Sequence, residues 1–346
     1  MERNINKPIF VVGSPRSGTS ILTWCLGHHP NLFPVPESNW MGDFAVNLAV
    51  AHKIGDARGD YSMFSAMDIG EDELFAMLGQ TINDLILHHR KHLETKREIR
   101  TVELKIEPLW LEATSMAAGP KERWVDGTPE YSFHIYGLRK LFPKALFVHL
   151  FRDVRAVVSS MLNFHRVTGI QLVANEEEAY RYWVRTVSAC LQAERAFGPS
   201  VVYRLRYADL INNPESPMRS LLEFLGEPYS AKCLEPLERR INSSEVPADF
   251  KFADAATDPG IVKEAVRLCS EIEETPQPAG ASSAAAAEIE TAFRQRVKYV
   301  ETVDSAYQSA QRMIKSLNNS GVPSHPVTEA GLPVANSSGS VLSRQP

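Results

Sequence analysis

A glycine-bracketed run near the amino end, Gly13 to Ser20 (GSPRSGTS), has the residue types of an anion-binding loop. Its spacing follows the nucleotide-binding pattern GxxxxGK followed by Ser or Thr, except that Thr19 stands where the lysine belongs. Backbone N–H groups of such a loop converge on one point, and the dipole of a following helix adds positive potential there. Because Arg16 is the cation inside the loop, the anion can be neutralised without a metal. The run therefore predicts a phosphate or sulfate site, the alternative being a tight turn with a solvated arginine.

A second run, FRDVRAVVSS from Phe151, offers another pair of anion-binding side chains. Arg152 follows an apolar segment, so it lies at the carboxyl end of a predicted strand, where open parallel sheets bind ligands. Ser160 lies eight positions further on, about two helical turns, and returns to the side of the helix start. A guanidinium and a hydroxyl suit a second phosphate. The alternative is that Arg152 pairs with Asp153 and that Ser160 only packs between helices.

The elements that must position these residues are short buried strands, each followed by helical spacing. Apolar, β-branched runs predict strands at residues 8–12, 145–151 and 200–205. Helices are predicted at residues 17–26, with Gly27 as the stop, and at residues 154–164. Strands separated by helices indicate an α/β fold of the P-loop NTPase type, a doubly wound parallel sheet flanked by helices.

Residues 41–121, between the first two strands, form a predicted helical insertion that includes an amphipathic helix at residues 71–93. The apolar face of that helix includes Met77 and Leu85. Large apolar side chains in and beside the insertion could line an acceptor pocket or belong to the core: Trp40, Phe44, Met63, Phe64, Met67 and Trp110.

The carboxyl end changes in composition. Residues 275–287 have the composition of a linker, and it leads into a predicted C-terminal helix over residues 284–317. We therefore predict one domain over residues 1–317. The last stretch, residues 318–346, is rich in Ser, Pro, Gly and Asn and is predicted to be disordered.

Composition narrows the classes of function. The 346 residues carry a net charge of −5, which argues against a general nucleic-acid binder. The four cysteines are scattered without metal-ligand spacing, so we expect no metal site and a reducing, cytoplasmic location. Because no apolar run approaches about 18 residues, no membrane span is expected. The oligomeric state stays open.

Together the two anion-binding runs resemble the PAPS-dependent sulfotransferases (PAPS is 3′-phosphoadenosine 5′-phosphosulfate), especially the branch with tyrosylprotein, glycan and many bacterial enzymes. The resemblance covers Pro8 to Leu225. IFVVGSPRSGTS is similar to the motif for the 5′-phosphosulfate, which implies donor contacts from Arg16, Ser17, Gly18, Thr19 and Ser20. FRDVRAVVSSM is similar to the motif for the 3′-phosphate, which implies that Arg152 and Ser160 bind it. A weaker likeness in YRLRYADL implies a donor contact from Tyr207.

The resemblance also implies a general base. In this branch a glutamate follows the "HP" after the first helix, and here Glu37 follows His29 and Pro30 in that order. A partly desolvated carboxylate can take the proton of an attacking hydroxyl. The alternatives are a solvated loop carboxylate or a cap of a following helix.

Two further points stay open at the level of sequence. The histidines His28, His29, His149 and His165 are also near the motifs, and His149 or His165 is the second choice for the base. Relatives often carry a lysine in a segment like WVDGTP that stabilises the transferring group, whereas this chain has Gly127. Arg16 and the loop amides would then stabilise the transferring group, or a cation from elsewhere would.

The implied reaction is an in-line transfer without a metal. Arg16 neutralises the leaving oxygen, Glu37 activates the acceptor, and adenosine 3′,5′-bisphosphate is released. The acceptor is a small-molecule, glycan or lipid hydroxyl, or an amine. One alternative is an ATP-dependent P-loop kinase, which would need a lysine at position 19 and an acid for magnesium. The other is an inactive nucleotide-binding scaffold, which the departure at Gly127 would favour.

Overall fold

The computed structural model describes residues 6–104, 120–238, 246–247, 250–252 and 256–319. The chain divides into two compact units, Met1–Val300 and Glu301–Pro346. The first unit contains the sheet and all described helices up to Val300. In the second unit, residues 301–319 are the carboxyl-terminal part of the last helix. The predicted disordered tail lies outside the described residues from position 320 onward, as does Trp110.

A five-stranded sheet forms the centre of the first unit, and all its described pairings are parallel. The strand order is β2-β3-β1-β4-β5. The bounds are β1 Ile9–Val12, β2 Leu32–Pro34, β3 Arg123–Asp126, β4 Leu146–Phe151 and β5 Val202–Arg206. Because β1 lies between β3 and β4, the strand order reverses at β1. Open parallel sheets bind ligands in the crevice at the carboxyl ends of the strands at such a point.

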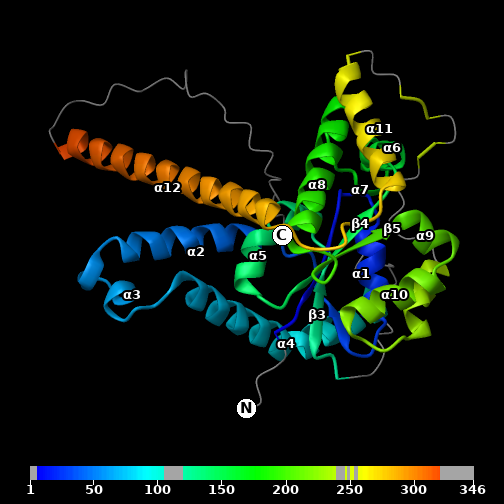
Figure 1. Ribbon diagram of the computed structural model, residues 1–346, viewed down its shortest axis with the longest axis horizontal. Coiled ribbons are helices and arrows are strands. Elements are labelled where there is room, and N and C mark those ends of the chain that lie inside the picture. The colour runs from blue at the N-terminus through cyan, green and yellow to red at the C-terminus, as the bar shows by residue number, and fades with distance from the viewer. Residues whose placement is uncertain (1–5, 105–119, 239–245, 248–249, 253–255, 320–346) are drawn as a thin grey trace. The chain divides into compact units, whose positions relative to one another are not determined.

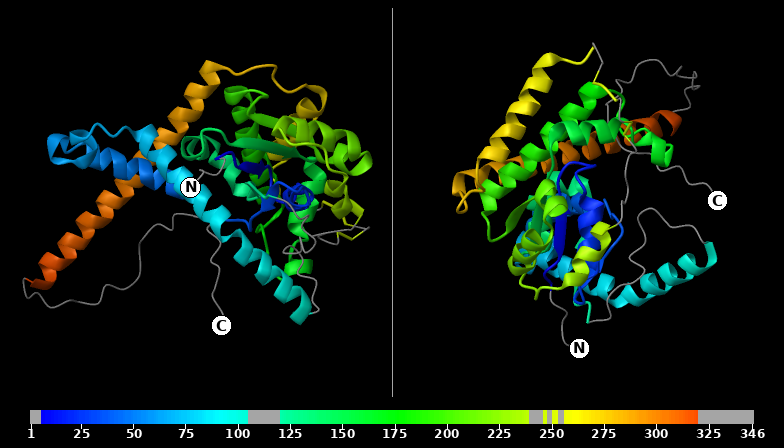
Figure 2. Two further views of the ribbon diagram at one scale, coloured as in Figure 1. Left: turned by 90° about the horizontal axis from the view of Figure 1, so that it is seen from below. Right: turned by 90° about the vertical axis from the view of Figure 1, so that its right-hand side faces the viewer.

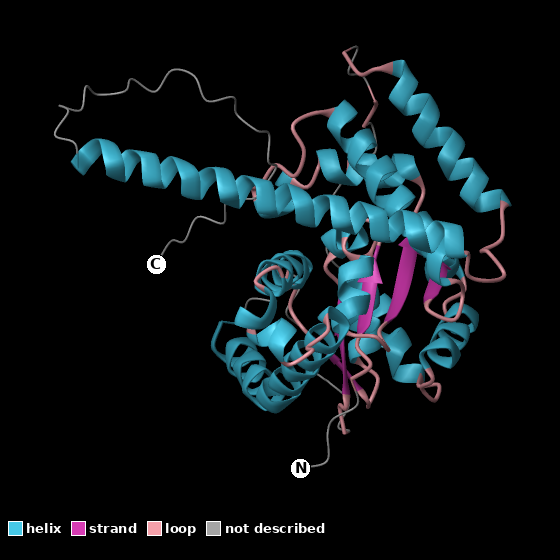
Figure 3. Cartoon of the chain, turned by 60° about the vertical axis from the view of Figure 1, so that its left-hand side comes forward, coloured by secondary structure: helices cyan, strands magenta, loops and turns pink. Residues whose placement is uncertain are grey.

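Helices cover both faces of the sheet (Figure 1, Figure 3) because the side chains of each strand alternate between two cores. Phe10 and Val12 of β1 belong to one core, packed by α2 (Met41–Asp56), α4 (Glu71–Leu104), α5 (Ile135–Leu141) and α8 (Glu176–Phe197). Ile9 and Val11 belong to the other, packed by α1 (Thr19–Gly27), α10 (Glu215–Leu225) and η3 (Ala231–Glu238). Figure 2 shows the same division from below, with α2 and α4 on the opposite side of the sheet from α10.

The remaining described elements are two 3-10 helices and six α-helices. Their bounds are η1 Gly59–Tyr61, α3 Met63–Ala66, η2 Pro129–Phe133, α6 Val154–Leu162, α7 His165–Thr168, α9 Tyr207–Asn212, α11 Pro259–Glu274 and α12 Ser283–Asn319. The fold class predicted from the sequence, an α/β parallel sheet of the P-loop type flanked by helices, is confirmed. The strands predicted at β1, β4 and β5 are also confirmed within two residues.

The local predictions for two helices were partly wrong. The helix predicted at residues 71–93 continues to Leu104, and Met77 and Leu85 are exposed because they lie off the face that packs on the core. The prediction that α1 ends at Gly27 is confirmed. Gly27 is the last helical residue, and a Cβ there would lie 2.5 Å from Pro34, so it also allows close packing.

Of the large apolar residues considered for an acceptor pocket, only Phe44 is packed against a buried core cluster among the described residues. Trp40, Met63 and Met67 are exposed, Phe44 packs edge-on against Trp40, and Phe64 stacks on a histidine of α2. No described helix is long and apolar enough to cross a membrane.

The segment with linker composition packs against the sheet. Gln277 accepts a hydrogen bond from Arg204 N at 3.0 Å and donates to the Val202 carbonyl, so it extends the hydrogen bonding of β5. The first turns of α12 then bury Ile289, Phe293 and Val297 in the core that faces α2 and α5. Composition alone gave no sign of this packing, because small and polar residues also occur in ordered segments that bind through backbone and amide groups.

Candidate active site

The loop between β1 and α1 turns at two glycines. Gly13 and Gly18 have φ angles of 148° and 105°, which other residues rarely adopt. A Cβ on Gly13 would lie 2.5 Å from the Leu150 carbonyl oxygen, so glycine lets the loop pass close to β4. Ser132 of η2 fixes the same turn, because its Oγ accepts a hydrogen bond from Gly13 N at 3.0 Å.

The loop presents donors that fit an anion. α1 begins at Thr19, and no side chain caps it at Gly18, which leaves its first backbone N–H groups for a ligand. The Oγ of Ser17 is buried and finds no hydrogen-bond partner among the described residues. A buried hydroxyl without a partner costs free energy unless a ligand satisfies it. These observations match the phosphate- or sulfate-binding loop that the sequence predicts.

Arg16 links the loop to the second predicted anion site. Its Nε donates to Ser160 Oγ at 3.2 Å, and its guanidinium lies 4.5 Å above the ring of Phe164. Burial and the charge of Arg152 lower the pKa of Arg16 to about 10, while Glu37 opposes that shift. Arg16 therefore stays charged at neutral pH, and it interacts with the cation Arg152 and with the carboxyl group of Glu37.

Arg152 and Tyr207 complete the convergence of the three segments. Arg152 Nη1 donates to the Arg16 carbonyl at 2.9 Å, and its guanidinium lies 4.4 Å above the Tyr207 ring. The same ring packs on Gly18, where an added Cβ would lie only 2.6 Å from it. The structure thus brings together the predicted residues Arg16, Gly18, Arg152, Ser160 and Tyr207 at the carboxyl end of β1 and β4.

Glu37 lies in the loop between β2 and α2, and its charge interacts with that of Arg16. Its carboxylate accepts a hydrogen bond from Ser20 of α1, and its side chain remains accessible to solvent. The surrounding protein partly desolvates it, and together with the nearby Glu130 and Asp126 this raises its pKa to about 7. A carboxyl group that is about half ionised at neutral pH is suited to general base catalysis.

Asp126, at the end of β3, anchors the Glu37 loop. Its Oδ2 accepts from Ser38 Oγ at 2.7 Å, and its Oδ1 accepts from Thr128 N at 2.9 Å. Burial raises the pKa of Asp126 to about 6 even though these hydrogen bonds oppose the shift. Tyr131 also hydrogen-bonds Ser38 and receives the Met41 amide at 3.1 Å.

Glu130 was not singled out from the sequence. Its Oε1 accepts a hydrogen bond from Tyr182 Oη of α8 at 3.0 Å, and its charge acts on Glu37. Burial, and then the charge of Glu130, raise the pKa of Tyr182, which stays a hydrogen-bond donor. The only signal in the sequence was that Glu130 follows the WVDGTP segment by one position, and nothing there pointed to α8.

The glycine at the lysine position of relatives has a steric explanation. A Cβ on Gly127 would lie 2.2 Å from Thr23 Oγ1 and 3.2 Å from Thr23 Cβ of α1, so a side chain there would require Thr23 to shift. Lys121 does not replace it. Its Nζ donates to the carbonyls of Gly27, His29 and Leu32, at the end of α1 opposite the anion loop.

The histidines considered as bases are placed elsewhere. His28 and His29 lie past the carboxyl end of α1, and His29 Nε2 contacts the Pro228 carbonyl at 2.9 Å. His149 is fully buried in β4 and its Nδ1 lies 2.6 Å from Glu194 Oε1. His165 is exposed at the start of α7, with Nδ1 at 3.0 Å from the Leu162 carbonyl. The geometry favours Glu37 over all four.

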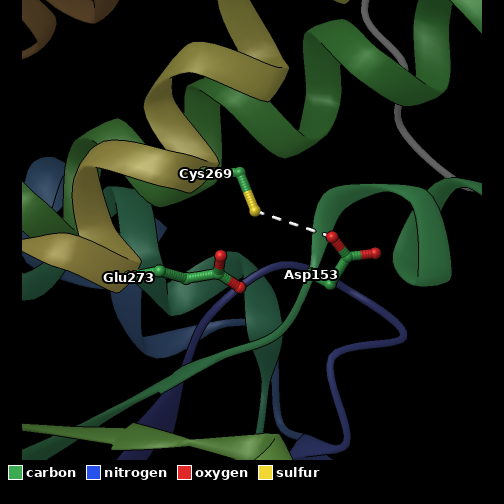
Figure 4. Close-up of side chains that lie close together, drawn as sticks. All are labelled: Asp153, Cys269 and Glu273. Carbon is green, nitrogen blue, oxygen red and sulfur yellow. Dashed lines mark hydrogen bonds between the residues drawn. The ribbon is translucent and has the colours of Figure 1, made fainter.

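One group of potential metal ligands occurs among the described residues, namely Asp153, Cys269 and Glu273, whose ligand atoms lie within 4.8 Å of one another (Figure 4). Cys269 Sγ of α11 lies 3.7 Å from Asp153 Oδ2, while Asp153 Oδ1 already caps α6 by accepting from Ala156 N. Burial raises the pKa of the Cys269 thiol to about 11, so the thiolate that binds metals is scarce at neutral pH. The group ties α11 to the start of α6.

Comparison with known proteins finds sulfotransferases among the relatives of this chain. The chain is 25% identical over 248 residues to omega-hydroxy-beta-dihydromenaquinone-9 sulfotransferase Stf3 of Mycobacterium tuberculosis, which covers 63% of this chain and 62% of that protein. It is 23% identical over 228 residues to protein-tyrosine sulfotransferase A of Caenorhabditis elegans, which covers 65% of this chain and 51% of that protein. The chain thus spans less than two thirds of the length of these curated relatives.

Solved structures are similar as well. Sulfotransferase STF1 from Mycobacterium tuberculosis aligns with a TM-score of 0.43 at 18% identity, covering 77% of each chain. The sulfotransferase domain from the curacin biosynthetic pathway aligns with a TM-score of 0.40 at 18% identity, covering 83% of this chain and 97% of that one. A family model described as "Sulfotransferase family" matches residues 8–231. Because that match extends over more than half of the chain and contains the anion loop, Arg152, Ser160 and Tyr207, this protein belongs to the sulfotransferase family.

Proposed function

We propose that this protein transfers the sulfuryl group of PAPS to an acceptor hydroxyl or amine by in-line displacement and releases adenosine 3′,5′-bisphosphate. The observation that carries the proposal is the position of Arg16. It donates to Ser160 Oγ at 3.2 Å, and its charge also interacts with that of Glu37. A single guanidinium therefore interacts both with a site for a second phosphate and with a candidate base.

In this proposal the loop holds the 5′-phosphosulfate. Backbone N–H groups from Arg16 to Ser20 and the buried Ser17 hydroxyl bind its oxygens. Arg152 and Ser160 bind the 3′-phosphate, and Tyr207 supports Arg152 by stacking under its guanidinium. The 3′-phosphate distinguishes PAPS from ATP, so these two residues would set the choice of donor.

In the chemical step, Arg16 and the loop amides would stabilise the developing charge, and Glu37 would take the proton of the acceptor. As the S–O bond to the donor breaks, negative charge grows on the bridging oxygen, and Arg16 with the loop amides stabilises it. The acceptor oxygen attacks the sulfur from the opposite side, and its proton passes to the Glu37 carboxylate. Because position 127 is a glycine, the cationic stabilisation is left to Arg16.

The names of the relatives support a hydroxyl acceptor. One is named for an omega-hydroxy menaquinone and another for protein tyrosine, and both acceptors carry hydroxyl groups. The site has no lysine at position 19, which a kinase would use on a γ-phosphate, and this disfavours ATP as the donor.

The test is calorimetric binding of adenosine 3′,5′-bisphosphate without metal, compared with ATP plus magnesium, to the wild type and to Arg152→Ala. A desolvated arginine–phosphate contact is worth on the order of 2–5 kcal/mol, so its loss is measurable. Arg155→Ala is the matched control, because Arg155 is exposed one turn further along α6.

We expect the bisphosphate to bind more tightly than ATP, and that preference to collapse in Arg152→Ala but not in Arg155→Ala. A preference for ATP with magnesium in the wild type would overturn the proposal in favour of a kinase. Equal loss in both variants would mean that the effect is one of net charge and that Arg152 does not contact the 3′-phosphate.

A further inference from the structure

A cavity of about 220 Å³ lies between α2, α5, α8 and the first turns of α12, all within the first unit. Most of its lining is apolar, including Val46, Phe133, Ile135, Ala189, Ile289 and Phe293. Gly137 of α5 brings this helix close, since a Cβ there would lie 2.9 Å from Ala45 and 3.1 Å from Phe293. An apolar cavity of about 150 Å³ is enough to hold benzene. This one therefore has room for a substituted ring or an alkyl segment of about six to eight carbons.

The polar side chains that line this cavity already have partners. Ser132 Oγ donates to the Pro129 carbonyl at 2.7 Å, Gln192 Nε2 donates to Glu288 at 3.4 Å, and Tyr136 hydrogen-bonds Glu290. Arg296 Nη1 lies 3.2 Å from His134 Nε2, and its Nη2 donates to Asp43 Oδ1 at 2.9 Å. Because an arginine only donates, His134 Nε2 is the acceptor and the ring is neutral. Burial, and then the charge of Arg296, lower the pKa of His134 to about 4, which agrees with a neutral ring.

This pairing decides which ligand chemistry fits. The ion pair of Arg296 and Asp43 is internally compensated, so a charged ligand gains no opposite charge there. A sugar would bury hydroxyl groups in a lining whose polar side chains already have partners, and each hydroxyl left without a partner there costs free energy. A neutral hydrocarbon group loses nothing on entering and gains burial.

The cavity adjoins the candidate active site through η2. Glu130, which acts on Glu37, and Phe133, which lines the cavity, are three residues apart in this 3-10 helix. Residues at that spacing lie on the same side of a 3-10 helix, about 6 Å apart along its axis. Tyr182 contacts both of them: its Oη donates to Glu130 at 3.0 Å, and its ring is parallel to that of Phe133 with centroids 6.5 Å apart.

We propose that this cavity binds the hydrocarbon part of the acceptor, so that the substrates are neutral alcohols with an extended apolar chain or ring whose hydroxyl reaches Glu37 past Tyr182 and Phe133. The inference rests on the proposed function and names its substrate class. Glu130 and Tyr182 then act as positioning residues at the junction between the reacting hydroxyl and the apolar part.

The test measures binding first, so that it does not depend on turnover. Calorimetry with n-butanol, n-octanol and methyl glucoside is done on the full chain with saturating adenosine 3′,5′-bisphosphate. Each methylene that enters the cavity is expected to tighten binding about fourfold, so n-octanol should exceed n-butanol by on the order of a hundredfold. Turnover with PAPS should show the same order in kcat/KM.

Two variants fill the cavity, and one controls for the substitution. Ala292→Phe on α12 and Ala189→Phe on α8 replace lining residues, whereas Ala287→Phe changes an exposed residue of α12 outside the lining. Both filling variants should weaken n-octanol about tenfold or more and leave n-butanol and the bisphosphate unchanged. Ala287→Phe should leave all three ligands unchanged.

The outcomes separate this inference from the proposed function. If the wild type does not bind the bisphosphate, the proposed function fails first. If it binds the bisphosphate but shows no preference for n-octanol, or prefers methyl glucoside, the cavity is not an acceptor site. A preference for n-octanol that survives in both filling variants would place the hydrocarbon elsewhere and would also overturn the inference.

Discussion

Replacing Glu37 by glutamine tests whether this carboxylate takes the acceptor proton. Glutamine keeps the size of the side chain and its ability to hydrogen-bond Ser20, but it cannot accept a proton. General base catalysis typically contributes about 10²–10⁴-fold to a rate, so we expect kcat to fall by that factor in Glu37→Gln. The KM for PAPS should change little, because the proposed donor contacts do not include Glu37.

The pH dependence gives a sharper magnitude. With a pKa of about 7, Glu37 is ionised in about one tenth of the molecules at about pH 6 and in about nine tenths at about pH 8. The kcat/KM of the wild type should therefore rise about tenfold over this interval. An ordinary glutamate, with a pKa of about 4.3, would give a flat profile over the same range. Glu130→Gln removes a like charge, so it should lower the pKa of Glu37 and move the rise to lower pH.

The assay is initial-rate sulfuryl transfer at saturating PAPS across the pH range, with a readout of the released bisphosphate. The rise should be present in the wild type, displaced in Glu130→Gln and absent in Glu37→Gln. If Glu37→Gln retains both wild-type turnover and the wild-type pH profile, the base has been wrongly assigned. If Glu130→Gln leaves the inflection in place, the desolvation of Glu37 and not its acidic neighbour sets the pKa.

Two other predictions concern the loop and the core. Gly18→Ala forces a Cβ against the Tyr207 ring and strains a backbone φ of 105°, so it should weaken bisphosphate binding by on the order of tenfold or more, measured by calorimetry. Glu194→Gln breaks the buried contacts of this residue with His149 and Arg204 and should lower the free energy of unfolding by about 3–5 kcal/mol in denaturant titrations at neutral pH. Burial opposes the charged form of His149, but Cys190 and Glu194 raise its pKa to about 10; the stabilisation is thus complete below the unfolded pKa of about 6.5 and is lost as the pH rises through about 10.

Each of these two has its own control. Gly169 also has a positive φ, 73°, but nothing lies within 4 Å of a Cβ added there, so Gly169→Ala should cost only backbone strain and leave binding intact. Equal effects of the two glycine variants on binding would refute the role given to Tyr207. For the core, the decline in wild-type stability from about pH 7 to about pH 10 should shrink in Glu194→Gln. An unchanged slope would mean that His149 is not the group that titrates.

Local patterns were enough for the parts of the fold that depend on neighbouring residues. A β-branched apolar run, two glycines and a following amphipathic stretch specify strand, turn and helix through contacts within about twenty residues. The loop at Gly13 and Gly18 and the strand before Arg152 were predicted for that reason. β2 and β3 were missed because they have only three and four residues, and because β3 also carries polar residues. Arg123 lies buried in β3, which its pairing at 2.7 Å with Glu227 and its bond to the Lys7 carbonyl at 2.8 Å make possible.

The candidate site divides in the same way. The sequence by itself determined which residue types are present at the loop, at Arg152 and Ser160, and at Glu37, since motif spacing encodes them. Only the tertiary structure decided the pKa of Glu37, the close approach of Thr23 to Gly127 and the cavity beside Phe133. Those properties arise from groups that meet across η2, α1, α8 and α12, and a linear sequence does not record the distance between residues that are far apart along the chain.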